Sequence, residues 1–156
     1  MIKITAVSYL NTKPLLYGLF KSGLNEQIDL QLDIPSVCAD KLVAGTVDLG
    51  LVPVASIPKL QHPHIVSDFC IGADGAVKTV CIFSDCPIED LTHLYLDFHS
   101  RTSVQLAQVL LREYWNIQPI LMQAKEGFIE KINGTTGAVV IGDRTIGLDL
   151  KHEYCS

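Results

Sequence analysis

A polar loop between Ser8 and Pro14 is the first place where the chain gathers groups that can bind a small molecule. It follows the apolar, strand-like stretch Ile2–Val7, and in open α/β sheets ligands bind beyond the carboxyl ends of the strands. Asn11 carries both a hydrogen-bond donor and an acceptor, and Thr12 adds a hydroxyl group. Either this loop binds a carboxylate of a ligand, or Asn11 and Thr12 only cap the helix that Pro14 opens.

A second candidate is the turn that ends at Gly75 and leads into the strand-like residues 77–83. Glycine lets a backbone come close to a ligand, because it has no side chain to keep the ligand away. Thr79 would then present its hydroxyl group to a ligand cleft. The alternative is an ordinary turn followed by a strand threonine.

A third candidate is the run Ser100, Arg101, Thr102 and Ser103, which enters a predicted helix at residues 102–114. Hydroxyl groups and unpaired backbone N–H groups at the start of a helix attract anions. The positive charge of Arg101 strengthens that attraction, so the run is expected to bind a carboxylate. Any well-capped helix has a similar sequence.

Two residues are candidates for a general base. His99 is the one histidine beside a proposed binding segment, and histidine is the commonest proton acceptor in enzymes. Asp143 lies just after the predicted strand at residues 137–141 and could act as a general base or orient one. It could equally cap a helix or pair with Arg144, and this structural role is preferred. No metal-ligand spacing occurs, so no metal is expected, and neither a phosphate-binding glycine loop nor a dinucleotide fingerprint is present.

Composition narrows the class of protein. Hydrophobic residues make up 48% of the 156 residues, enough for a buried core, and the net charge of −5 with no basic run argues against nucleic acid as a partner. No apolar run approaches the ~18 residues of a membrane span, and the N-terminus reads as a strand and not as a signal peptide. The five cysteines are odd in number and show no C-x-x-C spacing, which fits reduced thiols in a cytoplasmic protein.

The elements that position these groups follow an α/β pattern. Strands are expected at residues 2–7, 28–34 and 47–52, with helices between them, and this β-α-β-α-β order predicts a parallel sheet. The second half repeats the pattern, with strands near 77–83, 94–96, 118–121 and 137–141. We therefore expect two α/β lobes, residues 1–84 and 85–156. A short strand is also expected at 65–71, and no closing element after Lys151.

Four segments together resemble one known family: Val7–Leu15, Ala44–Ile57, Ser100–Leu111 and Gly137–Ile146. They are similar to the chorismate dehydratases of the futalosine route to menaquinone. The resemblance implies a two-lobed fold like that of type II periplasmic binding proteins, with the C-terminal segment that returns to complete the first lobe missing from this chain. It also implies a lyase that dehydrates chorismate to 3-(1-carboxyvinyloxy)benzoate in the cytoplasm, without a cofactor.

The resemblance also implies roles for individual residues. Asn11 and Thr79 fall at positions that contact the ligand in the cleft, and threonine keeps the hydroxyl group where relatives often have serine. The helix start at Ser100–Ser103 would take a ligand carboxylate. The proton acceptor stays open between His99, Asp143 and the side-chain carboxylate of the substrate itself. Chorismate is the expected partner, with neither nucleic acid nor membrane, and the oligomeric state is not indicated. The alternatives are a non-catalytic solute-binding module of the same fold and an inactive fragment of the enzyme.

Overall fold

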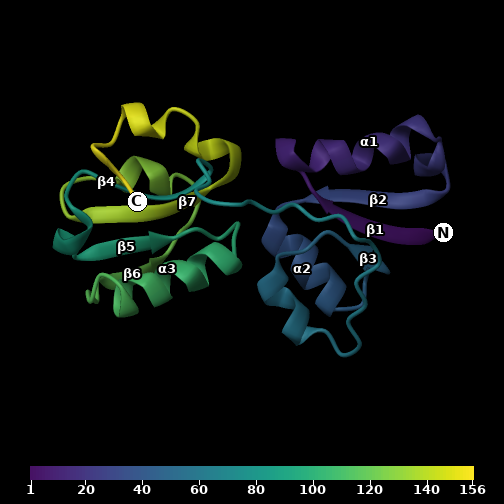
Figure 1. Ribbon diagram of the computed structural model, residues 1–156, viewed down its shortest axis with the longest axis horizontal. Helices are drawn as coiled ribbons and strands as arrows, with labels where there is room; N and C mark the ends of the chain where they lie inside the picture. The colour runs from purple at the N-terminus through teal and green to yellow at the C-terminus, as the bar shows by residue number, and fades with distance from the viewer. The chain divides into compact units, whose positions relative to one another are not determined.

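The computed structural model describes residues 1–156, and the chain divides into two compact units, Met1–Gly75 and Ala76–Ser156 (Figure 1). Both units are of the α/β class, as the sequence predicted. The boundary lies earlier than the expected one at Ser84. The reason is that β4 (Val80–Ser84) pairs along its length with β7 (Thr136–Ile141), so that β4 belongs to the second unit.

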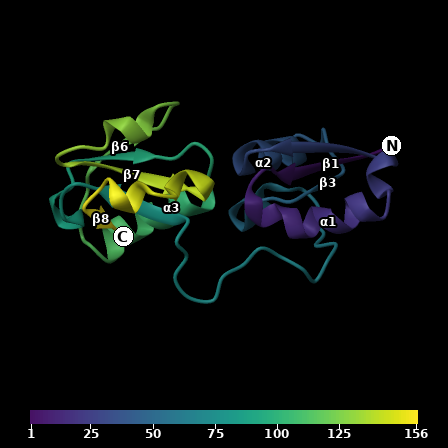
Figure 2. The ribbon, with the colours of Figure 1, turned by 90° about the horizontal axis from the view of Figure 1, so that it is seen from above.

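The first unit is built on a three-stranded parallel sheet with the order β2-β1-β3. Its strands and helices are β1 (Ile2–Val7), α1 (Lys13–Lys21), β2 (Ile28–Asp33), α2 (Pro35–Val43) and β3 (Leu49–Gly50). Its 3-10 turns are η1 (Leu10–Thr12), η2 (Leu24–Glu26) and η3 (Val54–Lys59). Because β2 and β3 lie on opposite sides of β1, right-handed crossovers put α1 and α2 on opposite faces of the sheet, as Figures 1 and 2 show. The predicted parallel sheet is confirmed here.

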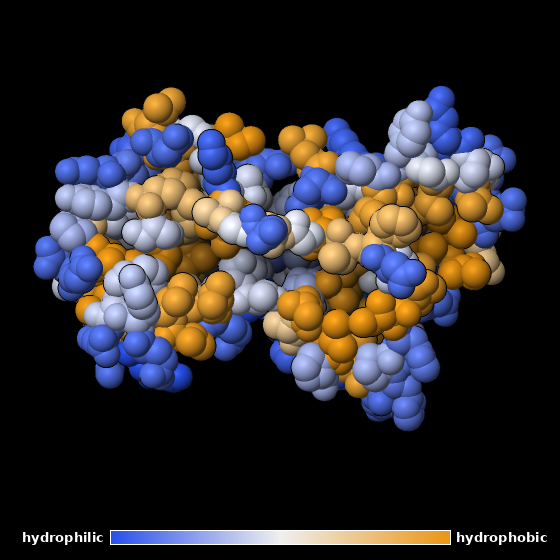
Figure 3. Space-filling view, viewed as in Figure 1, coloured by the Kyte–Doolittle hydropathy of each residue, from blue (hydrophilic) through white to orange (hydrophobic).

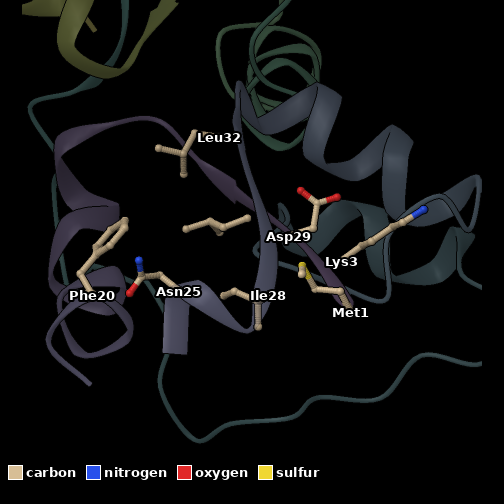
Figure 4. A pocket seen from close by; sticks show the side chains of 8 residues that line it. Met1, Lys3, Phe20, Asn25, Ile28, Asp29 and Leu32 are labelled. Atoms are coloured by element: carbon tan, nitrogen blue, oxygen red, sulfur yellow. The ribbon is translucent and has the colours of Figure 1, made fainter. Parts of the chain in front are cut away.

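Strand β2 shows the alternation that its sequence predicted. Ile28 and Leu32 lie on one face, toward Phe20 of α1, and Asp29 lies on the other (Figure 4). Part of the apolar face remains exposed, with Leu32 at 51% and Phe20 at 53%, and Figure 3 shows apolar side chains gathered on the surface of this unit. A pocket on this sheet is lined by residues of β1, α1, η2 and β2, and none of the predicted site residues is among them.

The second unit is a mixed five-stranded sheet with the order β6-β5-β7-β4-β8. Its remaining strands and its helix are β5 (His93–Leu96), α3 (Thr102–Glu113), β6 (Ile120–Gln123) and β8 (Tyr154–Cys155). Its 3-10 turns are η4 (Ile88–Asp90), η5 (Phe128–Lys131), η6 (Gly142–Thr145) and η7 (Leu148–Leu150). β5 runs parallel to β6 and β7, whereas β4 is antiparallel to β7 and β8. Phe83, Phe128, Ala138 and Val140 pack together in its core.

Two expectations about local structure were wrong. Residues 65–71 form no strand, because they lie in a stretch that is exposed throughout and no neighbouring strand pairs with them. The tail does contain a closing element, because β8 pairs with β4 through Phe83–Cys155 and Ser84–Tyr154. A two-residue strand has no periodicity of its own, and only its distant partner makes it a strand. No helix in the structure is both long and apolar enough to cross a bilayer.

Candidate functional site

Several predicted residues meet at one edge of the five-stranded sheet. β5 and β7 end at this edge, and the antiparallel β4 begins there, because Val80 pairs with Ile141. The Gly142 N–H donates to the Thr79 carbonyl oxygen at 2.9 Å. Thr79, whose side chain is exposed, therefore lies beside the turn that carries Asp143. Residues far apart in the chain share this edge because β5, β7 and β4 are neighbours in the sheet.

Asp97, which sequence reasoning did not single out, organises this edge. It follows β5 directly and is 1% exposed. Its carboxylate accepts hydrogen bonds from the Ile141 N–H at 3.0 Å, the His99 N–H at 2.9 Å and Arg144 Nη2 at 2.5 Å. Three donors on one carboxylate satisfy a charge that would otherwise be costly to bury. The signal in the sequence was its place as the first polar residue after a buried strand.

Arg144 also escaped selection as a site residue, and its partner differs from the one considered. The guanidinium pairs with Asp97 and not with Asp143, whose side chain is exposed and makes no ion pair. It lies over the rings of Phe98 and Phe128, with Cζ 5.9 and 5.7 Å from their centroids. Arg144 Nε is buried without a hydrogen-bond partner. The edge of the sheet thus holds the fixed positive charge of Arg144, whose Nε–H group has no acceptor within the fold.

His99 lies on the same edge with a perturbed acid–base equilibrium. Burial is the main cause that lowers its pKa, and the nearby Arg144 charge lowers it further, while Asp97 partly opposes both. Its ring packs edge-on against Phe98, with centroids 4.5 Å apart and an interplanar angle of 80°. The imidazole is therefore neutral near pH 7, which is the form that can accept a proton.

The helix start after His99 is capped by its own loop. Ser100 Oγ accepts the Ser103 N–H at 3.0 Å, and the Arg101 carbonyl accepts the Gln105 N–H at 3.2 Å. Ser100 therefore has the structural role that any well-capped helix shows, and the Ser103 N–H is already engaged. Arg101 and Thr102 are half-buried at the first turn of α3, where the helix dipole favours an anion.

The other predicted residues lie in the first unit. Asn11 and Ser8 are exposed in the connection between β1 and α1, and the Ser8 N–H donates to the Asp33 carbonyl oxygen at 2.9 Å. Thr12 occupies the N-cap position of α1 but its side chain makes no capping hydrogen bond, so the capping alternative for Thr12 is wrong. Gly75 has a φ of +93°, a conformation that other residues rarely adopt.

The structure thus brings the predicted residues together in two sets, one in each unit. The first surrounds the start of α1 and contains Ser8, Asn11 and Thr12. The second contains Thr79, His99, Asp143 and the Ser100–Ser103 run, at the edge that Asp97 and Arg144 organise. No group of three or more histidine, cysteine or carboxylate side chains is arranged to hold a metal ion. The first set offers hydroxyl and amide groups, and the second offers hydroxyl groups beside the positive charges of Arg101 and Arg144, a chemistry suited to small anions.

The model of a family described as menaquinone biosynthesis matches residues 2–155, nearly the whole chain. The match spans both compact units and therefore both sets of polar residues.

Proposed function

Since the chain belongs to the menaquinone biosynthesis family, the family of the futalosine-route chorismate dehydratases, we propose that it removes water from chorismate to give 3-(1-carboxyvinyloxy)benzoate. The match over residues 2–155 is the observation that carries the proposal. The polar character of the two residue sets supports it, because chorismate carries two carboxylates and a hydroxyl group that need donors.

The reaction asks the protein mainly for orientation and charge stabilisation. The hydrogen on ring carbon C3 leaves as a proton, the bond between C4 and its hydroxyl oxygen breaks, and the proton and hydroxide together make water. The product ring is aromatic, so the overall step is strongly favourable. Electron density moves toward the ring carboxylate as C3 loses its proton, and a site with fixed donors stabilises that charge without reorganising.

Particular residues fit these tasks. The N-terminal turn of α3, with Arg101 and Thr102, is proposed to bind one carboxylate of the substrate. Asn11 and Thr79 are proposed to contact the ligand, as the resemblance to the family implies, and their amide and hydroxyl groups can orient the ring or assist the departing hydroxide. The exposure of both side chains supports these roles, since neither is used inside the fold. His99 is proposed as the protein base, because its lowered pKa keeps the imidazole neutral and able to accept a proton.

The proposal is tested by incubating the purified chain with chorismate and separating the products by chromatography. We expect 3-(1-carboxyvinyloxy)benzoate to form with the wild type and to be absent, or formed far more slowly, with Asn11→Ala. Asn25→Ala is the matched control, because Asn25 lies on η2 and lines the pocket on the sheet face of the same unit; it should retain the wild-type rate. A chain that binds chorismate in calorimetry but yields no product would be a binding module instead, and one without a cooperative thermal transition would be an unfolded fragment.

A further inference from the structure

Two buried hydroxyl groups of the first unit have no hydrogen-bond partner. Thr12 is 0% exposed and Ser56 is 1% exposed, and neither Thr12 Oγ1 nor Ser56 Oγ meets a donor or acceptor. Buried polar groups in folded proteins are nearly always paired, because leaving one unpaired is destabilising. Two such groups in one unit of this size therefore indicate a role that the folded chain alone does not show.

Other buried hydroxyl groups of this protein follow the rule. Thr5 Oγ1 donates to Asp33 Oδ2 at 3.2 Å, and Ser84 Oγ donates to the Cys86 carbonyl at 2.7 Å. Both residues are as deeply buried as Thr12 and Ser56, at 0% and 2% exposed. The contrast shows that this fold can satisfy a buried hydroxyl group, and that it does not do so at Thr12 and Ser56.

Both unpaired groups lie on loops that leave the same edge of the sheet. Thr12 ends η1, which follows the carboxyl end of β1, and Ser56 lies in η3, which follows the carboxyl end of β3. β1 and β3 are adjacent and parallel. The chain passes from β1 to β2 on one side of β1 and then to β3 on its other side, so the order of the strands reverses between β1 and β3. In open α/β sheets this reversal opens a crevice at the carboxyl ends of the strands, and ligands bind there.

The charge at this edge favours an anion. Thr12 is the N-cap residue of α1, a nine-residue helix, and its side chain accepts no hydrogen bond from the N–H groups of the first turn. The positive end of the helix dipole is therefore not compensated by a capping side chain. Asp33, the last residue of β2, carries a carboxylate that is paired with Lys41 Nζ at 2.5 Å. The local charge of the helix end is therefore not cancelled by Asp33.

We propose that Thr12 and Ser56 donate their two hydroxyl hydrogens to one carboxylate group of the ligand at the β1–β3 crevice. Ser56 becomes a substrate-binding residue, and the first unit acquires its own carboxylate subsite, separate from the start of α3 in the second unit. The assignment deepens the proposed function and rests on it for the identity of the ligand, chorismate. A carboxylate supplies two acceptor oxygens, which matches two donors.

Thermal unfolding without ligand tests whether the hydroxyl groups are unpaired. Thr12→Val replaces the hydroxyl group with a methyl group of similar size, and we expect the Tm to rise by roughly 2–4 °C because an unsatisfied buried group is removed. Ser56→Ala should leave the Tm unchanged or higher. The matched controls Thr5→Val and Ser84→Ala remove paired groups and should lower it. A fall in Tm for Thr12→Val and Ser56→Ala as large as in the controls would overturn the proposal.

Binding of a carboxylate tests the subsite itself. With chorismate, we expect Thr12→Val and Ser56→Ala each to raise KM roughly tenfold or more with kcat nearly unchanged, as for lost contacts that substrate and transition state share. Benzoate, titrated by calorimetry, is the second probe and should also bind both variants more weakly. Wild-type affinity in both variants would overturn the subsite, as would a wild-type chain that binds neither compound. Binding that depends on Thr12 and Ser56 without turnover would overturn only the dehydratase assignment.

Discussion

Arg144 donates a hydrogen bond to Asp97 across the edge of the second sheet, with Nη2 2.5 Å from Oδ2. The two residues are 47 positions apart in the chain, and the pairing of β5 with β7 brings them together. The Asp97 side chain is fully buried, while that of Arg144 retains 28% of its exposure. This pair connects the turn after β7 to the loop that leads into α3, the two segments that carry Asp143, His99 and the Ser100–Ser103 run.

The ion pair should be important for stability. Asp97→Asn removes the negative charge and leaves the Arg144 guanidinium without its counter-ion. We expect the free energy of unfolding to fall by about 3 kcal/mol, near the lower end of the range for buried ion pairs, because Arg144 is partly exposed. The measurement is the urea midpoint at constant m-value. Asp143→Asn is the matched control, since the exposed Asp143 carboxylate makes no ion pair, and its midpoint should stay close to the wild-type value. Equal midpoints for the two variants would contradict the assigned pairing.

His99 should make stability depend on pH below neutrality. Its pKa is lowered in the folded chain, mainly by burial, from the ordinary value of about 6.5. As pH falls below about 6.5, the unfolded chain takes up a proton that the folded chain still excludes, so the free energy of unfolding decreases down to the folded pKa. Above about pH 6.5 both states are neutral and the effect vanishes. His99→Gln should weaken this dependence in urea titrations at several pH values, whereas replacement of the exposed His64 should not.

The identity of the proton acceptor can be decided by turnover. If His99 takes the C3 proton, His99→Gln should lower kcat by roughly 10²–10⁴-fold, the usual contribution of a general base. If the substrate's own side-chain carboxylate does so, the double variant His99→Gln/Asp143→Asn should keep substantial turnover. Circular dichroism and chorismate binding serve as controls. Loss of all turnover in either single variant, with fold and binding intact, would contradict the substrate-assisted route.

Gly137 in β7 should not tolerate a side chain. A methyl group there would lie 2.9 Å from Leu91 Cδ2, closer than real contacts allow, and 3.0 Å from the Phe83 carbonyl oxygen, at the tight limit of real contacts. Because the Phe83 carbonyl belongs to the adjacent strand, Gly137→Ala should destabilise the protein by about 1–3 kcal/mol. Gly18→Ala in α1 is the control: no atom lies within 4 Å of the added methyl group, and it should stabilise by roughly 0.5–1 kcal/mol. Thermal melts of both variants give the comparison.

The thiols should differ in reactivity with alkylating agents. Burial, and next the neighbouring Cys155, raise the pKa of Cys81 to about 12, so its reactive thiolate is scarce near neutral pH. Cys70 is exposed. Timed iodoacetamide labelling of the native protein, read by peptide mass spectrometry, should therefore modify Cys70 well before Cys81. In urea, where burial no longer acts, the two residues should react at similar rates. Faster labelling of Cys81 in the native chain would contradict the assigned environment.

The sequence by itself determined the α/β class and most of the elements, because these depend on local patterns. The alternation of Ile28, Leu30 and Leu32 predicted β2, and the apolar run at residues 137–141 predicted β7. Pro14 and Pro35 marked the helix starts, since both lie in the first turn of their helices. Family membership could be anticipated for the same reason: the segments that carry the resemblance are contiguous in the chain.

Only the tertiary structure decided which residues share an edge and which hydroxyl groups lack partners. The partner of Arg144 is Asp97 because β5 lies beside β7, and no spacing in the chain signals that neighbour. The unit boundary and β8 likewise depend on antiparallel pairing to β4, a long-range contact without a local signature. Ser56 shows the same limit, because a serine becomes an unpaired buried donor only when surrounding atoms exclude water and offer no acceptor. Burial and partner choice belong to the whole fold, and so they lie beyond any local pattern.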